Sequence, residues 1–155
     1  MQKELLQNMV MQNEMTCSYS FGRITEQNAV LRLAKPAASI GFIYRHIAET
    51  INLFCTFFGV TTEIQNTTMG KTDEGQGKNI HESRQLIEEG FSKLYQLIES
   101  QPDEYWLDNV DTPFFGTILR IRLFAHILFH NSHHAGQISM SLSRGSNYDP
   151  AELKE

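Results

Sequence analysis

The sequence is short of cysteine and of positive charge, and it has no long apolar run. Its two cysteines, Cys17 and Cys55, lie too far apart for a CxxC metal site, so we expect reduced, buried thiols. Lysine and arginine number 13 against 18 acidic residues, which argues against the basic face that nucleic-acid binding requires. No uncharged apolar run reaches the ~18 residues of a membrane span, and the first residues lack the apolar core of a signal peptide. We therefore expect a cytoplasmic protein without nucleic-acid or membrane partners.

The remaining composition is that of an ordinary globular protein. The chain has 155 residues, of which 41% are hydrophobic and 20% charged. This length is enough for one compact core and too short to favour two. The sequence therefore predicts a single domain over residues 1–155.

Almost every periodic segment of the chain has the period of a helix, and none has the alternation of a strand. Four helices are predicted: up to Gly22, from the cap Ser39 to about Gly59, from the cap Asn79 to before Pro102, and from about Thr117 to Arg144 with Gly145 as C-cap. The apolar face of the first helix is predicted to comprise Leu5, Leu6, Met9, Val10, Cys17 and Phe21.

The segment between the second and third predicted helices is long and poor in apolar residues. Residues 59–79 contain four of the ten glycines. An antiparallel helix hairpin needs only about 2–8 linking residues, whereas two parallel helices need a link that returns along the helix. The sequence thus predicts an all-α four-helix bundle with a long crossover between parallel second and third helices. The later connection, residues 104–116, is expected to pack Tyr105, Trp106 and Phe114 against one end of the bundle.

The last predicted helix carries four of the six histidines within the nine residues from His126 to His134. Residues four apart on a helix differ by only about 40° in direction, so His126, His130 and His134 form one stripe. Imidazoles at i and i+4 can bind one metal ion, which favours His130 and His134 as ligands, although an isolated pair can equally line a polar groove or core.

The other histidines of the sequence have different predicted roles. Three helical turns span about 12 Å, too far for one ion, so His126 is expected behind the ligands or in the core. His133 points about 100° away from His134, and His81 is expected on the surface beside the third helix's cap.

A third ligand must come from another helix. His46 is the only histidine in the middle of another apolar helix, which makes it the candidate. Glu49, one turn further on, is predicted to orient a histidine, hold a water or act as a base, or else to be a solvated carboxylate or a partner of Arg45. Gln137, one turn beyond His134, is expected to lie behind the ligands and to hydrogen-bond to another helix, or else to be an ordinary exposed residue, and Gly136 is expected to mark a close approach of two helices.

The segments SIGFIYRHIAET and HNSHHAGQI resemble the DinB/YfiT-like metal-dependent proteins, the second through the family's H-x-x-x-H-x-G-Q pattern. The resemblance covers nearly the full chain, from the first helix to Gly145. It implies an up-down-down-up four-helix bundle and a divalent metal bound by His46, His130 and His134. Many members have Arg where this chain has Ala135, so any contact made by that arginine is missing here.

The function implied by the resemblance is thiol-dependent S-transferase chemistry with a low-molecular-weight thiol. Three imidazoles leave a tetrahedral ion one open position, and a thiol or an activated water can occupy it. Metal-dependent hydrolysis, in which the activated water attacks a small-molecule substrate, is therefore the alternative enzyme class, and a non-catalytic metal-binding or interaction module is the other alternative. Zinc or nickel is the expected metal, with iron as a further choice, because imidazole suits all three. The ten phenylalanines and five tyrosines, together with the pairing of many relatives, favour a homodimer.

Overall fold

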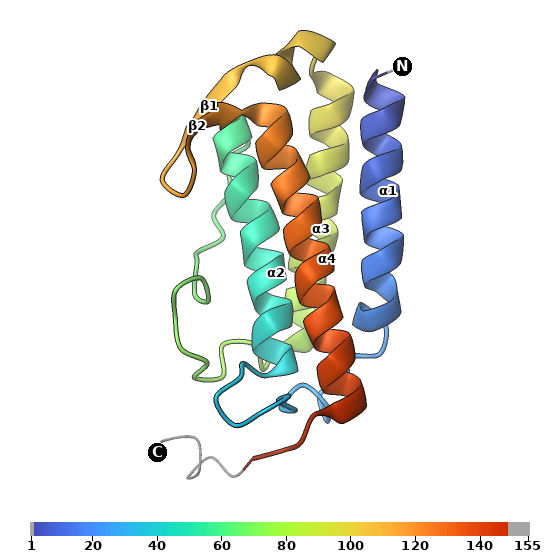
Figure 1. The fold of residues 1–155 in the computed structure, drawn as a ribbon, viewed down its shortest axis with the longest axis vertical. Helices are drawn as coiled ribbons and strands as arrows, with labels where there is room; N and C mark the ends of the chain where they lie inside the picture. The colour runs from blue at the N-terminus through green and yellow to red at the C-terminus, as the bar shows by residue number, and fades with distance from the viewer. Residues whose placement is uncertain (1, 149–155) are drawn as a thin grey trace.

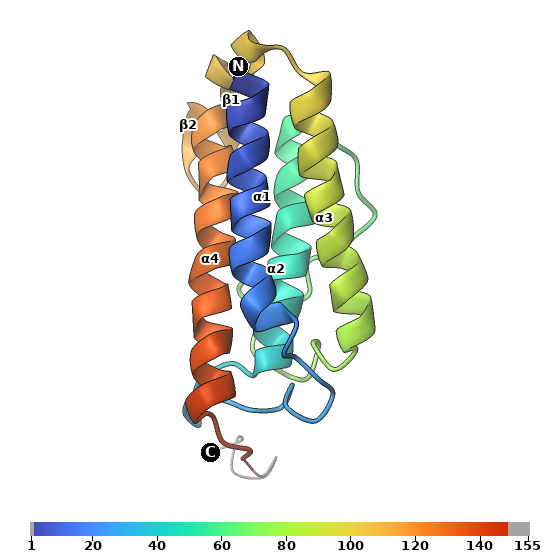
Figure 2. The same ribbon diagram turned by 90° about the vertical axis from the view of Figure 1, so that its right-hand side faces the viewer.

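Four long helices lie side by side in the computed structural model of the protein, which describes residues 2–148 (Figure 1). They are α1 (Gln2–Phe21), α2 (Ile40–Cys55), α3 (Ile80–Ser100) and α4 (Arg120–Arg144). Helix α1 packs against α3 and α4, and α2 packs against the same two helices (Figure 2). The predicted all-α four-helix bundle is therefore confirmed.

The helices α2 and α3 run in the same direction, and α1 and α4 run in the opposite one (Figure 1). The crossover, residues 59–79, returns along the outside of α2 from the end of that helix to the start of α3 (Figure 1). At its end the backbone passes so close to α2 that a Cβ atom on Gly77 would lie 1.9 Å from the carbonyl oxygen of Gly41. The parallel pair predicted from the length of the crossover is confirmed.

The predicted helix caps are present. The Ser39 hydroxyl accepts a hydrogen bond from the Phe42 N–H at 3.3 Å, and the Asn79 side chain accepts one from the Glu82 N–H at 3.0 Å. Gly145 donates its N–H to the Ser141 carbonyl at the end of α4 at 2.8 Å. These bonds pair backbone groups that the helix itself leaves unsatisfied, which fixes the helix ends.

The connection before α4 differs from the prediction. It holds η2 (Asp103–Leu107) and an antiparallel hairpin of β1 (Asn109–Thr112) and β2 (Gly116–Leu119), so the expectation of no strand was wrong. The strands of four residues are too short to show an alternating pattern, and β2 occupies the start predicted for the last helix. Trp106 is fully buried, with its ring centroid 5.2 Å from that of Phe124, so its predicted packing at the bundle end is confirmed.

The buried face of α1 is partly polar. Leu5 and Met9, predicted on this face, are 58% and 45% exposed, whereas Leu6, Val10, Cys17 and Phe21 are buried as predicted. Asn13 and Ser20 fill the remaining buried positions, donating to the α4 carbonyls of Leu128 and Ala135 at 2.7 and 2.9 Å. The helical spacing of apolar residues therefore predicted part of this face incorrectly, because hydrogen bonds to α4 allow polar residues to occupy core positions.

Both cysteines are free and buried, as the sequence predicted. Burial raises the pKa of each thiol to about 12, so neither is a thiolate at neutral pH. Among residues 2–148, no helix combines the length and the apolar character that crossing a membrane requires.

Candidate metal centre

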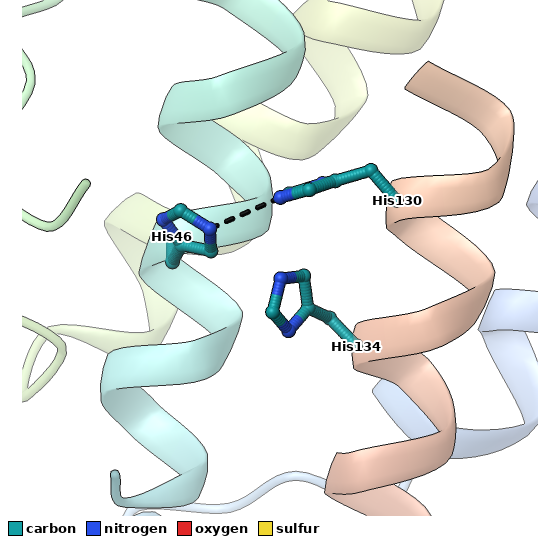
Figure 3. Close-up of side chains that lie close together, drawn as sticks. All are labelled: His46, His130 and His134. Atoms are coloured by element: carbon teal, nitrogen blue, oxygen red, sulfur yellow. Dashed lines mark hydrogen bonds between the residues drawn. The ribbon is translucent and has the colours of Figure 1, made fainter. Parts of the chain in front are cut away.

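Three half-buried histidines from two helices face one another between α2 and α4 (Figure 3). His46 comes from α2, and His130 and His134 come from successive turns of α4. One ring nitrogen of each lies within 4.8 Å of the other two, and the Nε2 atoms of His46 and His130 are 3.0 Å apart. The sequence-based grouping of these three side chains is therefore what the structure brings together, and they are positioned to bind a metal ion.

Hydrogen bonds set the tautomers of two of these histidines. The Nδ1 of His134 lies 2.6 Å from the Oε1 of Gln137, which can only accept, so Nδ1 carries the proton and Nε2 keeps a free lone pair. The Nδ1 of His46 lies 3.3 Å from the Thr68 hydroxyl, whose own proton goes to Glu49 at 2.7 Å. His46 is therefore the donor to Thr68, and its Nε2 is also unprotonated.

The third histidine lacks a complete set of partners. The Nδ1 of His130 is buried without a hydrogen-bond partner in the part of the chain that the structure describes, and so is the side-chain oxygen of the adjacent Asn131. If His130 is protonated on Nδ1, its Nε2 lone pair faces the Nε2 lone pair of His46 at 3.0 Å. If His130 is protonated on Nε2 instead, its buried Nδ1 is an acceptor to which no described group donates. A cation that accepts the two Nε2 lone pairs would relieve this conflict, because the proton of His130 could then stay on Nδ1. The residues present thus fit a metal ion.

The electrostatic surroundings keep the imidazoles neutral. Burial, with the neighbouring imidazoles, lowers the pKa of His130 to about 3. Burial and the proximity of His134 lower the pKa of His46 to about 4, and burial lowers the pKa of His134 as well. At neutral pH all three rings therefore offer lone pairs, the state that metal binding requires.

Glu49 is the acceptor at the end of the chain of hydrogen bonds that begins at His46. Its side chain is 2% exposed and accepts from the Arg45 guanidinium, the Thr68 hydroxyl, and the hydroxyl and N–H of Thr67, at 2.6–2.8 Å. Burial alone would raise the pKa of this carboxyl, but the bonds from Arg45, Thr67 and Thr68 outweigh it and hold the pKa below its ordinary value. Glu49 is thus a buried anion that pairs with Arg45 and is connected to His46 through the Thr68 hydroxyl.

The other histidines lie outside the group of three. His126 packs its ring against those of Phe115 and Phe54, with centroids 4.6 and 5.7 Å away, and is 6.1 Å from the ring of His130. His133 is exposed and accepts from the Nε2 of Gln137 at 3.2 Å. His81 is exposed, as predicted. The role of His126 behind the ligands or in the core stays a prediction.

The close helix approach predicted at Gly136 was wrong, and Gln137, predicted to reach another helix, instead bonds to His134 and His133 of its own helix. This glycine is exposed, and a Cβ atom built on it would meet no heavy atom within 4 Å in the described part of the chain. The contacts of Thr67 and Thr68 with Glu49 were not predicted from the sequence, because the crossover has no period and its threonines are typical of a loop. Their one signal is that two adjacent hydroxyl side chains occur in a segment that must pass along α2.

The comparison with protein families identifies the family of the chain. The family model of the DinB superfamily matches residues 12–138, which include His46, His130 and His134. The chain therefore belongs to the DinB superfamily, as its resemblance predicted. A search of the curated proteins finds no match.

Proposed function

We propose that this member of the DinB superfamily is a divalent-metal-dependent enzyme whose ion is bound by His46, His130 and His134, and that it catalyses thiol-dependent S-transfer. The observation that carries the proposal is the convergence of three neutral imidazoles beside a cavity that His46 and His134 help to line. An ion with three imidazole ligands keeps an open position, where it lowers the pKa of a thiol or a water.

The chain's own residues hold this arrangement rather than act on the substrate. Gln137 fixes the proton of His134 on Nδ1, and Thr68, backed by Glu49, does the same for His46. Glu49 is a weak candidate for a base, because its lowered pKa and the donors from Arg45, Thr67 and Thr68 leave it little tendency to take a proton. We therefore assign it a positioning role.

Zinc or nickel is the proposed metal, with iron as the next choice. Imidazole nitrogen is a ligand of intermediate softness that all three metals accept, and no carboxylate stands in the ligand group of the described residues. The two free, buried cysteines favour a reducing compartment such as the cytoplasm.

Metal analysis followed by cobalt substitution tests the proposal. Protein purified without a histidine tag should carry about one equivalent of a transition metal, and His133→Ala, which removes an exposed neighbour, should carry the same. Addition of a thiol to the Co(II) form should produce a thiolate charge-transfer band. Less than about half an equivalent, with no binding on titration, would reject the metal site. A loaded site that gives no band with any of several thiols would reject S-transfer and favour hydrolysis or a non-catalytic metal-binding module.

A homodimer is also proposed, paired through the groove between α1 and α4. The groove, about 460 Å³ in volume, is lined by uncharged residues that include Leu5, Met9, Ala125, Phe129 and Ser132, and Phe129 is 75% exposed. The chain has a net charge of -5, so two copies repel each other where their acidic residues meet. An uncharged, largely apolar face avoids this repulsion and favours pairing there.

Light scattering tests the pairing. The protein should have about twice the mass of a 17.8 kDa chain at micromolar concentration, and Phe129→Glu should make it a monomer. Leu107→Glu is the control, because Leu107 is a similarly exposed apolar side chain, 64% exposed, on η2. A wild-type monomer, or equal effects of both substitutions, would contradict the proposed face.

A further inference from the structure

A cavity of about 420 Å³ opens beside the three histidines. This volume lies in the range of small-molecule pockets, about 300–1,000 Å³. His46, Thr68, His134 and Gln137 form its polar end. Its other walls are formed by Leu33, Ala37, Ala38, Phe42, Ile43, Gly70 and Ser141. In the described lining the cavity thus has a polar end at the proposed metal and an end that is apolar apart from Ser141.

No lysine, arginine, aspartate or glutamate of the described residues lines this cavity. Arg32 lies in the segment that forms one wall, but its guanidinium pairs with Asp73 at 2.8 Å and donates to the Ala37 carbonyl at 2.6 Å. A carboxylate held at these walls, away from the proposed ion, would therefore lose water without gaining an ion pair with a side chain, which disfavours ligands whose distal group is anionic.

The wall formed by residues 33–38 is held in place at both ends. Asp73, from the crossover, pairs with Arg32 and also accepts from the Ser39 N–H at 2.8 Å. Arg32 in addition exchanges backbone hydrogen bonds with Ser146 beyond α4, at 3.0 and 2.9 Å. The cavity is consequently preformed, and a ligand does not have to order this segment in order to bind.

We infer that the cavity selects a ligand with an uncharged, apolar substituent, such as an alkyl or aryl thiol, over a thiol that carries carboxylates. The inference rests on the proposed function for the position of the metal-binding sulfur, and on the cavity lining for the nature of the substituent. Its polar end fits the atom that binds the ion, and its apolar end fits the rest of the molecule. Removing an aryl group's surface from water at about 25 cal/mol per Å², less the cost of ordering the ligand, corresponds to a gain of roughly 10- to 50-fold in affinity.

Thiol titrations of the Co(II)-substituted full chain test the inference. The probes are phenylmethanethiol, 2-mercaptoethanol and 4-(mercaptomethyl)benzoate, whose carboxylate lies at the far end of the ring and cannot chelate the ion together with the sulfur. The readout is the dissociation constant obtained from the charge-transfer band, with the thiols compared at equal thiolate concentration. Phenylmethanethiol should bind about 10- to 50-fold more tightly than 2-mercaptoethanol, and the added carboxylate of 4-(mercaptomethyl)benzoate should weaken binding about 10-fold or more relative to phenylmethanethiol. Equal or tighter binding of 4-(mercaptomethyl)benzoate than of phenylmethanethiol would overturn the inference.

A matched pair of substitutions locates the effect in the cavity. Ala37→Phe adds a ring to a lining residue and should weaken phenylmethanethiol about 10-fold or more while 2-mercaptoethanol binding stays the same. Ala34→Phe adds the same ring to an exposed residue of the same segment that does not line the cavity, and should change neither. Equal effects of the two substitutions on both thiols would contradict the assignment of the cavity. The ranking of the three thiols in the wild-type protein remains decisive if Ala37→Phe does not fold.

A second ligand type separates this inference from the proposed function. Imidazole and 4-phenylimidazole bind an open metal position without thiol chemistry, and their binding shifts the Co(II) d–d bands. If no thiol gives a band but 4-phenylimidazole binds at least about 10-fold more tightly than imidazole, S-transfer is rejected and the apolar cavity stands. If thiols give a band and neither phenyl-bearing probe gains affinity over its smaller counterpart, the cavity inference is rejected and the metal-thiolate chemistry stands.

Discussion

Replacing Glu49 by Gln tests whether the buried carboxylate supports the metal centre. The substitution keeps the shape of the side chain but removes its charge and replaces an acceptor oxygen by a donor. The carboxylate accepts from Arg45, from Thr68 and twice from Thr67. Hydrogen bonds to charged groups contribute about 1.5–3 kcal/mol each, and breaking a buried ion pair costs about 3–5 kcal/mol. Because Gln retains one acceptor oxygen and Arg45 still pairs with Glu82, we expect the free energy of unfolding to fall by only about 3 kcal/mol.

The same substitution should also weaken metal binding. With an amide N–H₂ facing it, the Thr68 hydroxyl loses the acceptor that fixes its direction, and it no longer reliably accepts from the Nδ1–H of His46. Losing a partner behind a metal ligand lowers affinity by about 10- to 100-fold. Urea unfolding of the metal-free protein and competition with a chromophoric chelator measure the two effects separately.

Two further variants serve as controls for Glu49→Gln. Glu82→Gln removes the other partner of Arg45, a half-exposed carboxylate 2.9 Å away. It should lower the free energy of unfolding by less than about 1 kcal/mol and leave metal affinity unchanged. Thr68→Val interrupts the path from Glu49 to His46 but keeps the Arg45 pair, so it should reproduce the affinity loss with a smaller loss of stability. Metal affinity within about twofold of wild type in both Glu49→Gln and Thr68→Val, against the 10- to 100-fold expected, would refute the orienting role.

Three other predictions follow from the geometry. Free metal at 1,000 times its Kd should raise the free energy of unfolding by about 4 kcal/mol, and calorimetry should show this increment retained in His133→Ala and lost when alanine replaces His46, His130 or His134. Because the pKa values of His46 and His130 are about 4 and 3, below the ordinary value of 6.5, the unfolded metal-free chain binds more protons below pH 6.5. The free energy of unfolding of the metal-free protein should therefore fall as the pH drops from 6.5 towards 4, by up to about 1.4 kcal/mol per pH unit for each histidine. Urea unfolding at several pH values measures this, and a free energy that does not change over the range would contradict the burial of neutral rings. Gly136→Ala should raise the free energy of unfolding in urea by about 1 kcal/mol, since no heavy atom of residues 2–148 lies within 4 Å of a Cβ atom built there; a loss of stability would contradict this.

The helices were predictable because their boundaries depend on local signals. Ser39 and Asn79 cap helices whose apolar residues repeat with the helical period, and the length of the crossover fixes the relative direction of the helices that it joins. The hairpin was not predictable, because four-residue strands carry no measurable period and depend on packing against the bundle. The buried face of α1 was misread where Asn13 takes a core position, since its partners on α4 lie more than a hundred residues away in sequence.

The candidate site was predictable to the extent that helix geometry determines it. His130 and His134 share a stripe whatever the rest of the chain does, and His46 is the histidine of the other central helix. The residues behind them were less accessible, because the position of Thr68 depends on how an aperiodic crossover returns along α2. Gly136 illustrates the opposite error, in which a residue that is costly in a helix was assigned an internal reason that the described structure lacks.

The crossover connects the topology of the bundle to the chemistry of the site. Parallel α2 and α3 require a chain segment that runs the length of α2 on its outer side, and this segment delivers Thr67 and Thr68 to Glu49 and contributes Gly70 to the cavity. It also delivers Asp73, which ties down the wall between α1 and α2. A short antiparallel hairpin would pack the same helices but would leave Glu49 and the Nδ1 of His46 without these partners. The crossover therefore contributes directly to the proposed metal centre. Substitutions of its residues that contact the site should change metal and ligand affinity more than they change the stability of the fold.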